Sequence, residues 1–257
     1  NFASIVRAVE EGRGVYDNIQ KYLIYLLSTN SGELLTMFAG VMFAGALGLV
    51  SADAGLFLPL LAVQLLWINL VTDGPPALAL GVDPKDADVM NRPPRPRGSG
   101  VLITEDWIRL VCVGVFMMIG TIAVLDAYYP GGMFTLFATS AQPNHADEMH
   151  ARTMAFTTLM VFQLFYVFNC RSRRRSAFIG FFENGWLLGA VALSLGMHVL
   201  VIYVPVMRTA FETVPLTLAD WGVAMAVGAT LLLTTETAKI GLRRADRRSR
   251  RKAATAA

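Results

Sequence analysis

The sequence predicts an all-α protein, a polytopic membrane bundle of six transmembrane helices with an N-terminal cytoplasmic stalk helix. Hydrophobic residues make up 54% of the chain and charged residues only 16%, with a mean hydropathy of +0.50, which departs from an average soluble domain. Six apolar segments approach the roughly 20 residues that cross the hydrocarbon core of a bilayer. Basic residues gather on alternate connecting loops, as in multi-pass membrane proteins.

Three regions are expected along the chain. Residues 1–21 form the stalk, which lacks the short apolar core of a cleavable signal peptide. Residues 22–243 form the six-helix transmembrane domain, and residues 244–257 form a basic cytoplasmic tail. A chain that opens on Asn1 without an initiator Met suggests a fragment or an excised domain. The spans are expected at residues 22–50, 56–82, 107–127, 154–169, 186–206 and 221–235, the fourth and sixth being a little short.

Charge placement predicts how the helices are threaded. Of the 22 basic residues, only Arg152 and Arg208 fall in the loops assigned to the outside. Both termini are therefore expected in the cytoplasm. The tail is interpreted as a topology signal that also contacts anionic lipid, and no nucleic-acid partner is expected. The inside loops and tail hold Lys85, Arg92, Arg95, Arg97, Arg171, Arg173, Arg174, Arg175 and the run from Arg243 to Lys252.

The second span carries polar side chains at membrane depth and then breaks its own helix. Asn69, Thr72 and Asp73 fall at i, i+3 and i+4, which places three oxygen-bearing side chains on one helical face. Pro75 and Pro76 cannot donate backbone hydrogen bonds, so the carbonyls four residues before them become available. Ionisable groups at this depth usually face an ion or substrate path, so the segment is expected to dehydrate and hold a hard cation.

The first span carries a second polar cluster. Asn30 and Glu33 share a face, and Gly32 allows another backbone to approach closely. A carboxylate buried without a partner has no packing advantage over Leu, so Glu33 is interpreted as functional. Ser28 and Thr29 are interpreted as interhelical hydrogen-bonding groups.

The candidate ligands carry only oxygen donors. Gln163, in the fourth span, is either a further ligand or a plain interhelical bond. Two carboxylates with amide and hydroxyl oxygens favour calcium over zinc or copper, although manganese accepts the same ligands. Cys112 and Cys170 are interpreted as apolar fillers, and the three histidines add no ligand. The candidate metal ligands are Asn30, Glu33, Asn69, Thr72, Asp73 and Gln163.

Several motifs carry a family resemblance. They are NFASIV at 1–6, VEEGR at 9–13, NSGE at 30–33, QLLWINLVTDG at 64–74 and MNRPPR at 90–95. In this order they resemble the C-terminal transmembrane region of P-type calcium-transporting ATPases of the sarcoplasmic-reticulum type. The similarity is most specific in the first hundred residues and is mostly a pattern from the third span onward.

The resemblance implies that these spans are the last six of a ten-helix pump. In the family, an ATP-driven aspartyl-phosphate cycle moves calcium out of the cytoplasm and usually returns protons. By position, Asn30, Glu33, Asn69, Thr72 and Asp73 match family ligands, with Asp73 shared between two ion sites. Gln163 stands where the family has a glutamate, which leaves open whether one or two ions move per cycle. The stalk would join the phosphorylation domain, and a coupling loop would contact that domain through Asp86, Asp88, Arg92, Pro93 and Pro94.

The chain lacks the machinery for ATP. It has no Asp-Lys-Thr-Gly phosphorylation motif and no Gly-rich phosphate loop, so alone it is not expected to hydrolyse ATP. ATP and Mg²⁺ would act through the actuator, nucleotide and phosphorylation domains of the same pump. The earlier helices, one of which completes an ion site in the family, are further expected partners, together with membrane lipid. A bacterial host, suggested by the Ala- and Arg-rich tail, would place the chain in the plasma membrane.

The mechanism expected from the carboxylates is proton exchange. With calcium bound, Glu33 and Asp73 are ionised, and once the helices separate they would take up protons, because low dielectric favours the neutral acid. Two alternatives stay open at this point. One is a secondary cation transporter or channel, although such proteins often pair two broken helices and here only one segment has a Gly-Pro-Pro interruption. The other is a noncatalytic membrane regulator derived from a pump.

Overall fold

The computed structural model of the chain describes residues 1–49, 57–85, 88–93, 100–134, 136–137, 144–172 and 182–256, with side chains described up to residue 241. Every regular element within these residues is a helix, so the predicted all-α class is confirmed. The elements are α1 (Phe2–Met42), α2 (Ala62–Trp67), η1 (Ile68–Thr72), α3 (Gly74–Gly81), η2 (Val89–Asn91), α4 (Thr104–Tyr128), α5 (His145–Cys170), α6 (Gly185–Tyr203), α7 (Pro205–Phe211) and α8 (Leu218–Ala256).

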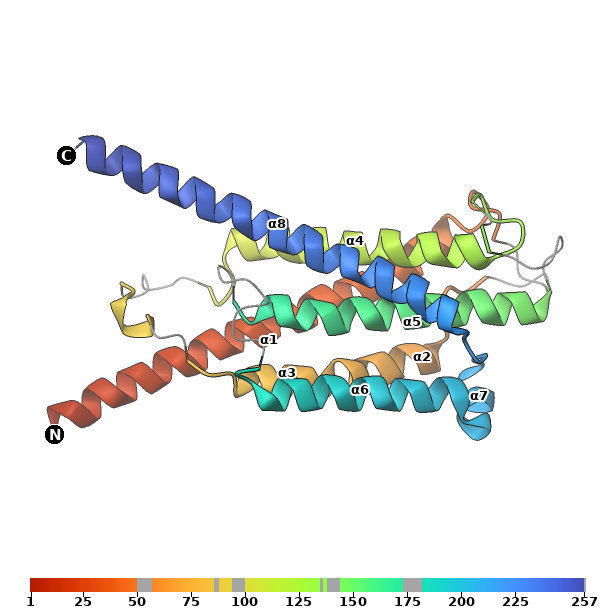
Figure 1. Ribbon diagram of the computed structural model, residues 1–257, viewed down its shortest axis with the longest axis horizontal. Coiled ribbons are helices and arrows are strands. Elements are labelled where there is room, and N and C mark those ends of the chain that lie inside the picture. The colour runs from red at the N-terminus through yellow and green to blue at the C-terminus, as the bar shows by residue number, and fades with distance from the viewer. Residues whose placement is uncertain are drawn as a thin grey trace.

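The helices form one elongated bundle with α5 in its interior (Figure 1). In its most apolar stretch, 94% of α5 is buried, against 22% for α8. α4 packs against both α1 and α5, α8 crosses over α5, and α3 packs between α1 and α6. Leu66, Leu70 and Leu78 on the broken second segment are more than 70% exposed, as expected for side chains that face lipid.

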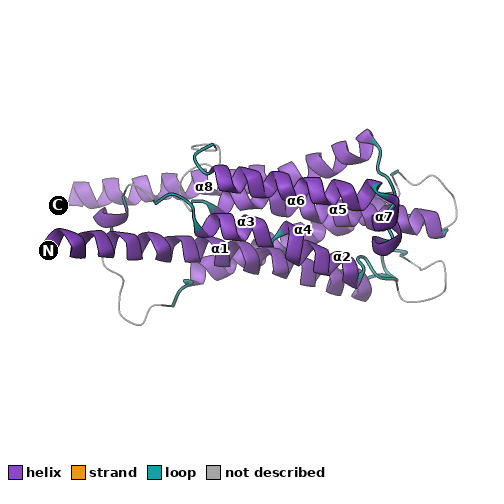
Figure 2. Cartoon of the chain, turned by 90° about the horizontal axis from the view of Figure 1, so that it is seen from below, coloured by secondary structure: helices purple, strands orange, loops and turns teal. Residues whose placement is uncertain are grey.

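Four of the six expected spans form helices long and apolar enough to cross a membrane, namely α4, α5, α6 and α8. The other two form α1, which carries the polar cluster, and the interrupted segment α2–η1–α3. Their crossing of the membrane stays a prediction. The four apolar helices support an integral membrane protein, and both chain ends lie at the same end of the bundle (Figure 2).

The expected bounds of the fourth and sixth spans were too short. α5 begins at His145 because the Asn144 side chain caps it, accepting a hydrogen bond from the Asp147 amide at 2.9 Å. Arg152, expected in an outside loop, therefore lies within α5, where it is buried and pairs with Glu148 at 2.7 Å. α8 likewise begins before the expected boundary, at Leu218.

The stalk and the tail are not separated from the spans by breaks. α1 runs through the expected boundary at residue 21 as one helix of 41 residues, and α8 continues into the basic tail as far as Ala256. A rigid helix would transmit a displacement of the stalk to the polar cluster on α1. The assignment of residues 1–21 as a stalk between domains stays a prediction.

Candidate cation-binding site

The second membrane segment changes its helical winding where its polar residues lie. In η1, a π-helical turn, the backbone amide of Asp73 donates to the carbonyl of Ile68, five residues earlier, at 2.9 Å. α3 starts at Gly74 with Pro75 and Pro76 in its first turn, where the missing amide hydrogens are tolerated. π-helical turns within helices are frequent at functional sites. This one presents Asp73 at the junction of two helical pieces.

Asp73 is fully buried and faces α1. The Tyr25 hydroxyl donates to its Oδ1 at 2.9 Å, and the Thr29 hydroxyl donates to its Oδ2 at 2.6 Å. Tyr25 and Thr29 are four residues apart and so lie on one face of α1. The interpretation of Thr29 as an interhelical hydrogen-bonding residue is confirmed, as is that of Ser28, whose hydroxyl lies 3.2 Å from the Tyr166 hydroxyl.

Glu33 lies one turn beyond Thr29 on α1 and joins two other segments. Asn69 Nδ2 donates to its Oε2 at 2.7 Å, and Gln163 Nε2 from α5 donates to its Oε1 at 2.8 Å. Thr29, which contacts Asp73, and Glu33, which contacts Asn69, are one turn apart on α1, so the two acids lie at the same contact between α1 and the broken segment. That they share one ion pocket stays a prediction.

The described residues place no counter-charge against these two acids. Within the described part of the chain, no Lys, Arg or His forms an ion pair with Glu33 or Asp73, whose exposed fractions are 5% and 0%. The described donors to their oxygens are neutral hydroxyls and amides. Two buried carboxylates without a cation are costly when both are ionised, so this arrangement favours a bound cation or bound protons.

Two further candidate ligands present oxygens that lack partners. Among the described residues, Thr72 Oγ1 and Gln163 Oε1 are buried and accept or donate no hydrogen bond. Native proteins rarely leave a buried polar atom unpaired, so these two oxygens have capacity for a further contact beside the two acids. Together with the two carboxylates, these oxygens match the preference of calcium for hard oxygen ligands. The residues present thus fit a transported hard cation.

The two asparagines lie differently from the other candidates. Asn30 is exposed on α1, and no described hydrogen bond connects its side chain to Glu33, Asp73 or their partners. Asn69 is also exposed, although its amide reaches Glu33. Both are open to contact from a neighbouring helix. Their role as ligands stays a prediction, as it does for the other four residues.

Sequence reasoning missed two residues that shape the site. Tyr25 precedes Thr29 and Glu33 at i, i+4 and i+8, a spacing that could have identified it. Ser194 on α6 donates to the Val71 carbonyl at 2.7 Å, so one carbonyl that the prolines leave without a helical donor is bonded from another helix. No local pattern marks Ser194, because its partner lies 123 residues away.

Small residues bring α4 close to the cluster. A Cβ added at Gly114 on α4 would lie 3.2 Å from the backbone nitrogen of Gly32, so the two backbones are nearly in contact. The prediction that Gly32 admits a neighbouring helix is confirmed. This contact fixes α1 laterally one residue before Glu33.

The remaining metal-binding residue types lie apart from the site. Cys112 and Cys170 are both free thiols. His198 Nε2 lies 3.1 Å from the Thr157 hydroxyl, in agreement with its interpretation as a packed, hydrogen-bonded residue. The described residues contain no group of three or more His, Cys, Asp or Glu that could hold a metal.

The described part of the expected coupling loop is bound to α1. Arg92 pairs with Asp88 in the loop and with Asp17 on α1, both at 2.7 Å. Arg13 donates to the carbonyls of Val89 and Arg92 at 3.1 and 2.9 Å. The loop is therefore held on the stalk portion of α1. Two residues of the expected loop lie outside the described residues, Asp86 and Pro94.

Comparison with known proteins identifies a family. Residues 57–241 match the family model described as cation transporting ATPase, C-terminus. Calcium-transporting ATPase 1 of Bacillus cereus is 38% identical over 93% of this chain and 26% of its own length. Calcium-transporting ATPase of Bacillus subtilis is 37% identical over 89% of the chain and 23% of its own length, and calcium-transporting ATPase 1 of Yarrowia lipolytica is 35% identical over 86% and 21%.

The chain thus spans about a quarter of the length of the curated relatives it matches. The family model covers most of the chain, including the broken second segment and Gln163. The resemblance drawn from the sequence motifs is confirmed by these matches. The chain belongs to the C-terminal membrane region of the cation-transporting P-type ATPases.

Proposed function

We propose that this chain forms part of an ATP-driven pump that moves calcium out of the cytoplasm. The ion would bind at Asn30, Glu33, Asn69, Thr72, Asp73 and Gln163. The observation that carries the proposal is the pair of buried carboxylates, Glu33 and Asp73, which share a region without a cationic side chain among the described residues. The names of the relatives, all calcium-transporting ATPases, support calcium as the ion.

A divalent ion that enters the site would replace hydrogen-bond donors around the two acids. The Tyr25 and Thr29 hydroxyls and the Asn69 and Gln163 amides now contact the oxygens that a cation would bind. An amide can rotate to present its oxygen in place of its nitrogen, which turns a donor to Glu33 into a ligand for the ion. The oxygen of Gln163 is already free of a described partner.

Proton counter-transport follows from the same geometry. When calcium leaves, the carboxylates remain buried, and protons neutralise them at lower cost than two bare charges. The pump would then carry protons inward on the acids that carried calcium outward. ATP and Mg²⁺ would act through the actuator, nucleotide and phosphorylation domains, and an additional helix would cover the exposed Asn30 and Asn69. Both chain ends would lie in the cytoplasm.

The test uses the full-length protein that carries this chain, purified and reconstituted in lipid vesicles. ATP hydrolysis is titrated with calcium, manganese and sodium, and uptake of radioactive calcium and of protons is followed in parallel. We expect calcium to activate hydrolysis, and calcium and proton fluxes to run in opposite directions. An ATP hydrolysis rate that does not depend on calcium would overturn the proposal that calcium is the ion. Calcium uptake without proton movement would overturn the proposal of proton counter-transport.

The residue assignment is tested with Asp73→Asn. Removal of one of the two negative charges should lower the calcium affinity by about 5- to 150-fold, which corresponds to the roughly 1–3 kcal/mol expected for a lost charged contact. The matched control is Asp126→Asn, because Asp126 is equally buried but accepts the amides of Met133 and Phe134 at the other end of the bundle. Retention of wild-type affinity in Asp73→Asn would remove Asp73 from the site.

A further inference from the structure

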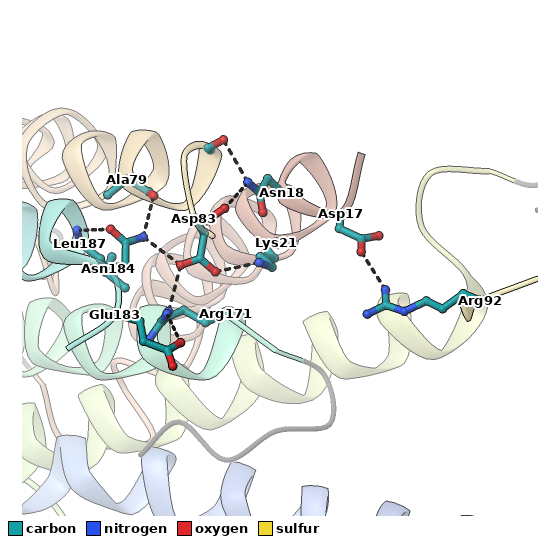
Figure 3. Close-up of polar contacts among 11 residues, drawn as sticks. Asp17, Asn18, Lys21, Ala79, Asp83, Arg92, Arg171, Glu183, Asn184 and Leu187 are labelled. Atoms are coloured by element: carbon teal, nitrogen blue, oxygen red, sulfur yellow. Dashed lines mark hydrogen bonds and ion pairs between the residues drawn. The ribbon is translucent and has the colours of Figure 1, made fainter. Parts of the chain in front are cut away.

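A second buried charge cluster lies where α3 ends. Asp83 is 5% exposed, and its carboxylate accepts from Lys21 Nζ at 2.7 Å, Arg171 Nε at 3.1 Å and Asn184 Nδ2 at 2.9 Å. Asn18 Nδ2 also donates to the Asp83 backbone carbonyl at 2.8 Å. Figure 3 shows the Asp83 side chain pointing between these groups. We call these five residues the Asp83 cluster.

The Asp83 cluster joins the same three segments that form the cation site. Lys21 lies on α1, twelve residues before Glu33, and Asp83 lies ten residues after Asp73, with α3 between them. Arg171 closes the C-terminal end of α5, eight residues after Gln163. The broken segment thus supplies Asp83, and the other two segments of the cation site, α1 and α5, each supply one cation that pairs with it.

The two clusters differ in whether their acids have cationic partners. At the cation site no cationic side chain of the described residues pairs with the two acids, whereas Asp83 pairs with two cations, Lys21 and Arg171, whose side chains are 10% and 11% exposed. A buried ion pair contributes little net stability, but loss of one partner is costly because the other charge stays buried. Without the Asp83 carboxylate, Lys21 and Arg171 would repel each other, while Arg171 would keep its longer pair with Glu183 at 3.9 Å. The middle of α1 and the C-terminal end of α5 would then be pushed apart.

Asn184 fixes a fourth helix to the same point. Its side-chain oxygen accepts from the Leu187 amide at 3.0 Å as the N-cap of α6, while its Nδ2 donates to both Asp83 and the Ala79 carbonyl. α6 also carries Ser194, which bonds the Val71 carbonyl beside the cation site. α3 and α6 are therefore tied together at both ends of the eight-residue helix α3.

We propose that Asp83 is a positioning residue for the cation site, and that the Asp83 cluster sets the spacing of α1, α3 and α5 on which ion affinity depends. α3 is about 12 Å long at 1.5 Å per residue, so a shift of its Asp83 end moves the Asp73 end as a rigid body. Packed helices transmit such shifts because their interfaces do not deform continuously. The inference rests on the proposed calcium site.

The test measures equilibrium calcium binding per folded molecule in the full-length protein, together with its thermal unfolding. Asp83→Asn keeps the shape of the side chain but puts an amide nitrogen opposite two cations. We expect the calcium dissociation constant to rise about tenfold, as for residues that modulate coupling between sites. Asp83→Glu, which restores the charge, should recover most of the affinity.

Lys85→Gln is the matched control. Lys85 lies two residues after Asp83 and also pairs with α1, through Glu11 at 2.6 Å and Glu10 at 3.5 Å, but on an exposed surface. Its loss should change the calcium dissociation constant by less than about twofold. An equal effect of Lys85→Gln and Asp83→Asn would show that any tether of the loop suffices, and the role of Asp83 would be overturned.

Thermal unfolding distinguishes a purely structural role of Asp83 from a positioning role. If the role is purely structural, Asp83→Asn lowers the unfolding temperature but leaves the calcium affinity of the folded molecules unchanged. That result would overturn the inference, while the proposed function would stand. If Asp83→Asn does not fold, Arg171→Gln provides the same test, because Asp83 then keeps Lys21 as a partner. We expect the calcium dissociation constant of Arg171→Gln to rise about threefold. An unchanged dissociation constant would overturn the inference. If the wild-type protein binds no calcium, the proposed function and this inference both fail.

Discussion

Replacing Gln163 with glutamate tests how closely this side chain faces the bound ion. Gln163 Nε2 now donates to Glu33 Oε1 at 2.8 Å, so Gln163→Glu would put two carboxylates in direct contact. With their charge centres about 4 Å apart and an effective dielectric constant of about 20, the repulsion is about 4 kcal/mol. This corresponds to about three orders of magnitude in an equilibrium constant. Without calcium, one of the two acids would therefore hold a proton at neutral pH.

Calcium binding to Gln163→Glu should then release one proton more than binding to the wild type. Because that proton must leave before the ion enters, the calcium dissociation constant should fall with rising pH more steeply than in the wild type, by about one additional proton. Affinity at alkaline pH should exceed that of the wild type, since a third carboxylate then faces the ion. The assay is binding of radioactive calcium to the full-length protein across neutral and alkaline pH.

A buried glutamine outside the site provides the control. Gln64 is fully buried on α2, where its amide donates to the Phe211 carbonyl at 2.9 Å and its oxygen accepts from the Leu61 amide at 3.1 Å. Gln64→Glu should lower stability without changing the pH slope of calcium binding. Identical slopes for Gln163→Glu and the wild type would refute the reasoning, because Gln163 would then not share a region with the ion.

Three further predictions concern the packing that supports the site. Gly114→Val should lower the free energy of unfolding by about 1–3 kcal/mol, because the added carbons meet α1; Gly189→Ala, with open space around its Cβ position, should change it little in the same denaturation assay. Arg152→Gln leaves Glu148 buried without its 2.7 Å partner and should cost about 3–5 kcal/mol. Thermal unfolding of that variant and of the double variant with Glu148→Gln should show partial recovery in the latter, and the absence of recovery would contradict the pairing. Ser194→Ala should cost about 1 kcal/mol by removing the donor to η1, and an unchanged unfolding temperature would show that another group replaces it.

Spacing within one helix supplied the candidate ligands. Glu33 was paired with Asn30, three residues earlier, and Asp73 with Asn69, four residues earlier. Their role as ligands stays a prediction, and the π-helical turn at Ile68–Thr72 departs from the regular repeat on which the second pairing depends. Asn30 shows that spacing does not predict which side chains are buried. It was expected on the same face as Glu33, but Glu33 is buried and the rotation of α1 in the bundle leaves the Asn30 side chain exposed.

The ends of the helices were harder to predict than the helices themselves. α5 extends nine residues before the expected start at Met154, because Asn144 provides a cap and Arg152 finds a buried partner in Glu148. A buried ion pair inside an apolar helix cannot be recognised from hydropathy, which counts both residues as loop-forming. Only the neighbouring elements show that these charges are enclosed.

The sequence by itself determined that the chain is helical, apolar enough for a membrane, and polar at a few positions in its first, second and fourth spans. Those properties depend on composition and on the helical repeat, which are local. Only the tertiary structure decided that η1 winds as a π-helical turn, that Tyr25 and Thr29 contact Asp73, and that Lys21 and Arg171 meet at Asp83. These contacts depend on the rotation and relative shift of separate helices, which close packing of the whole bundle sets and no single segment encodes.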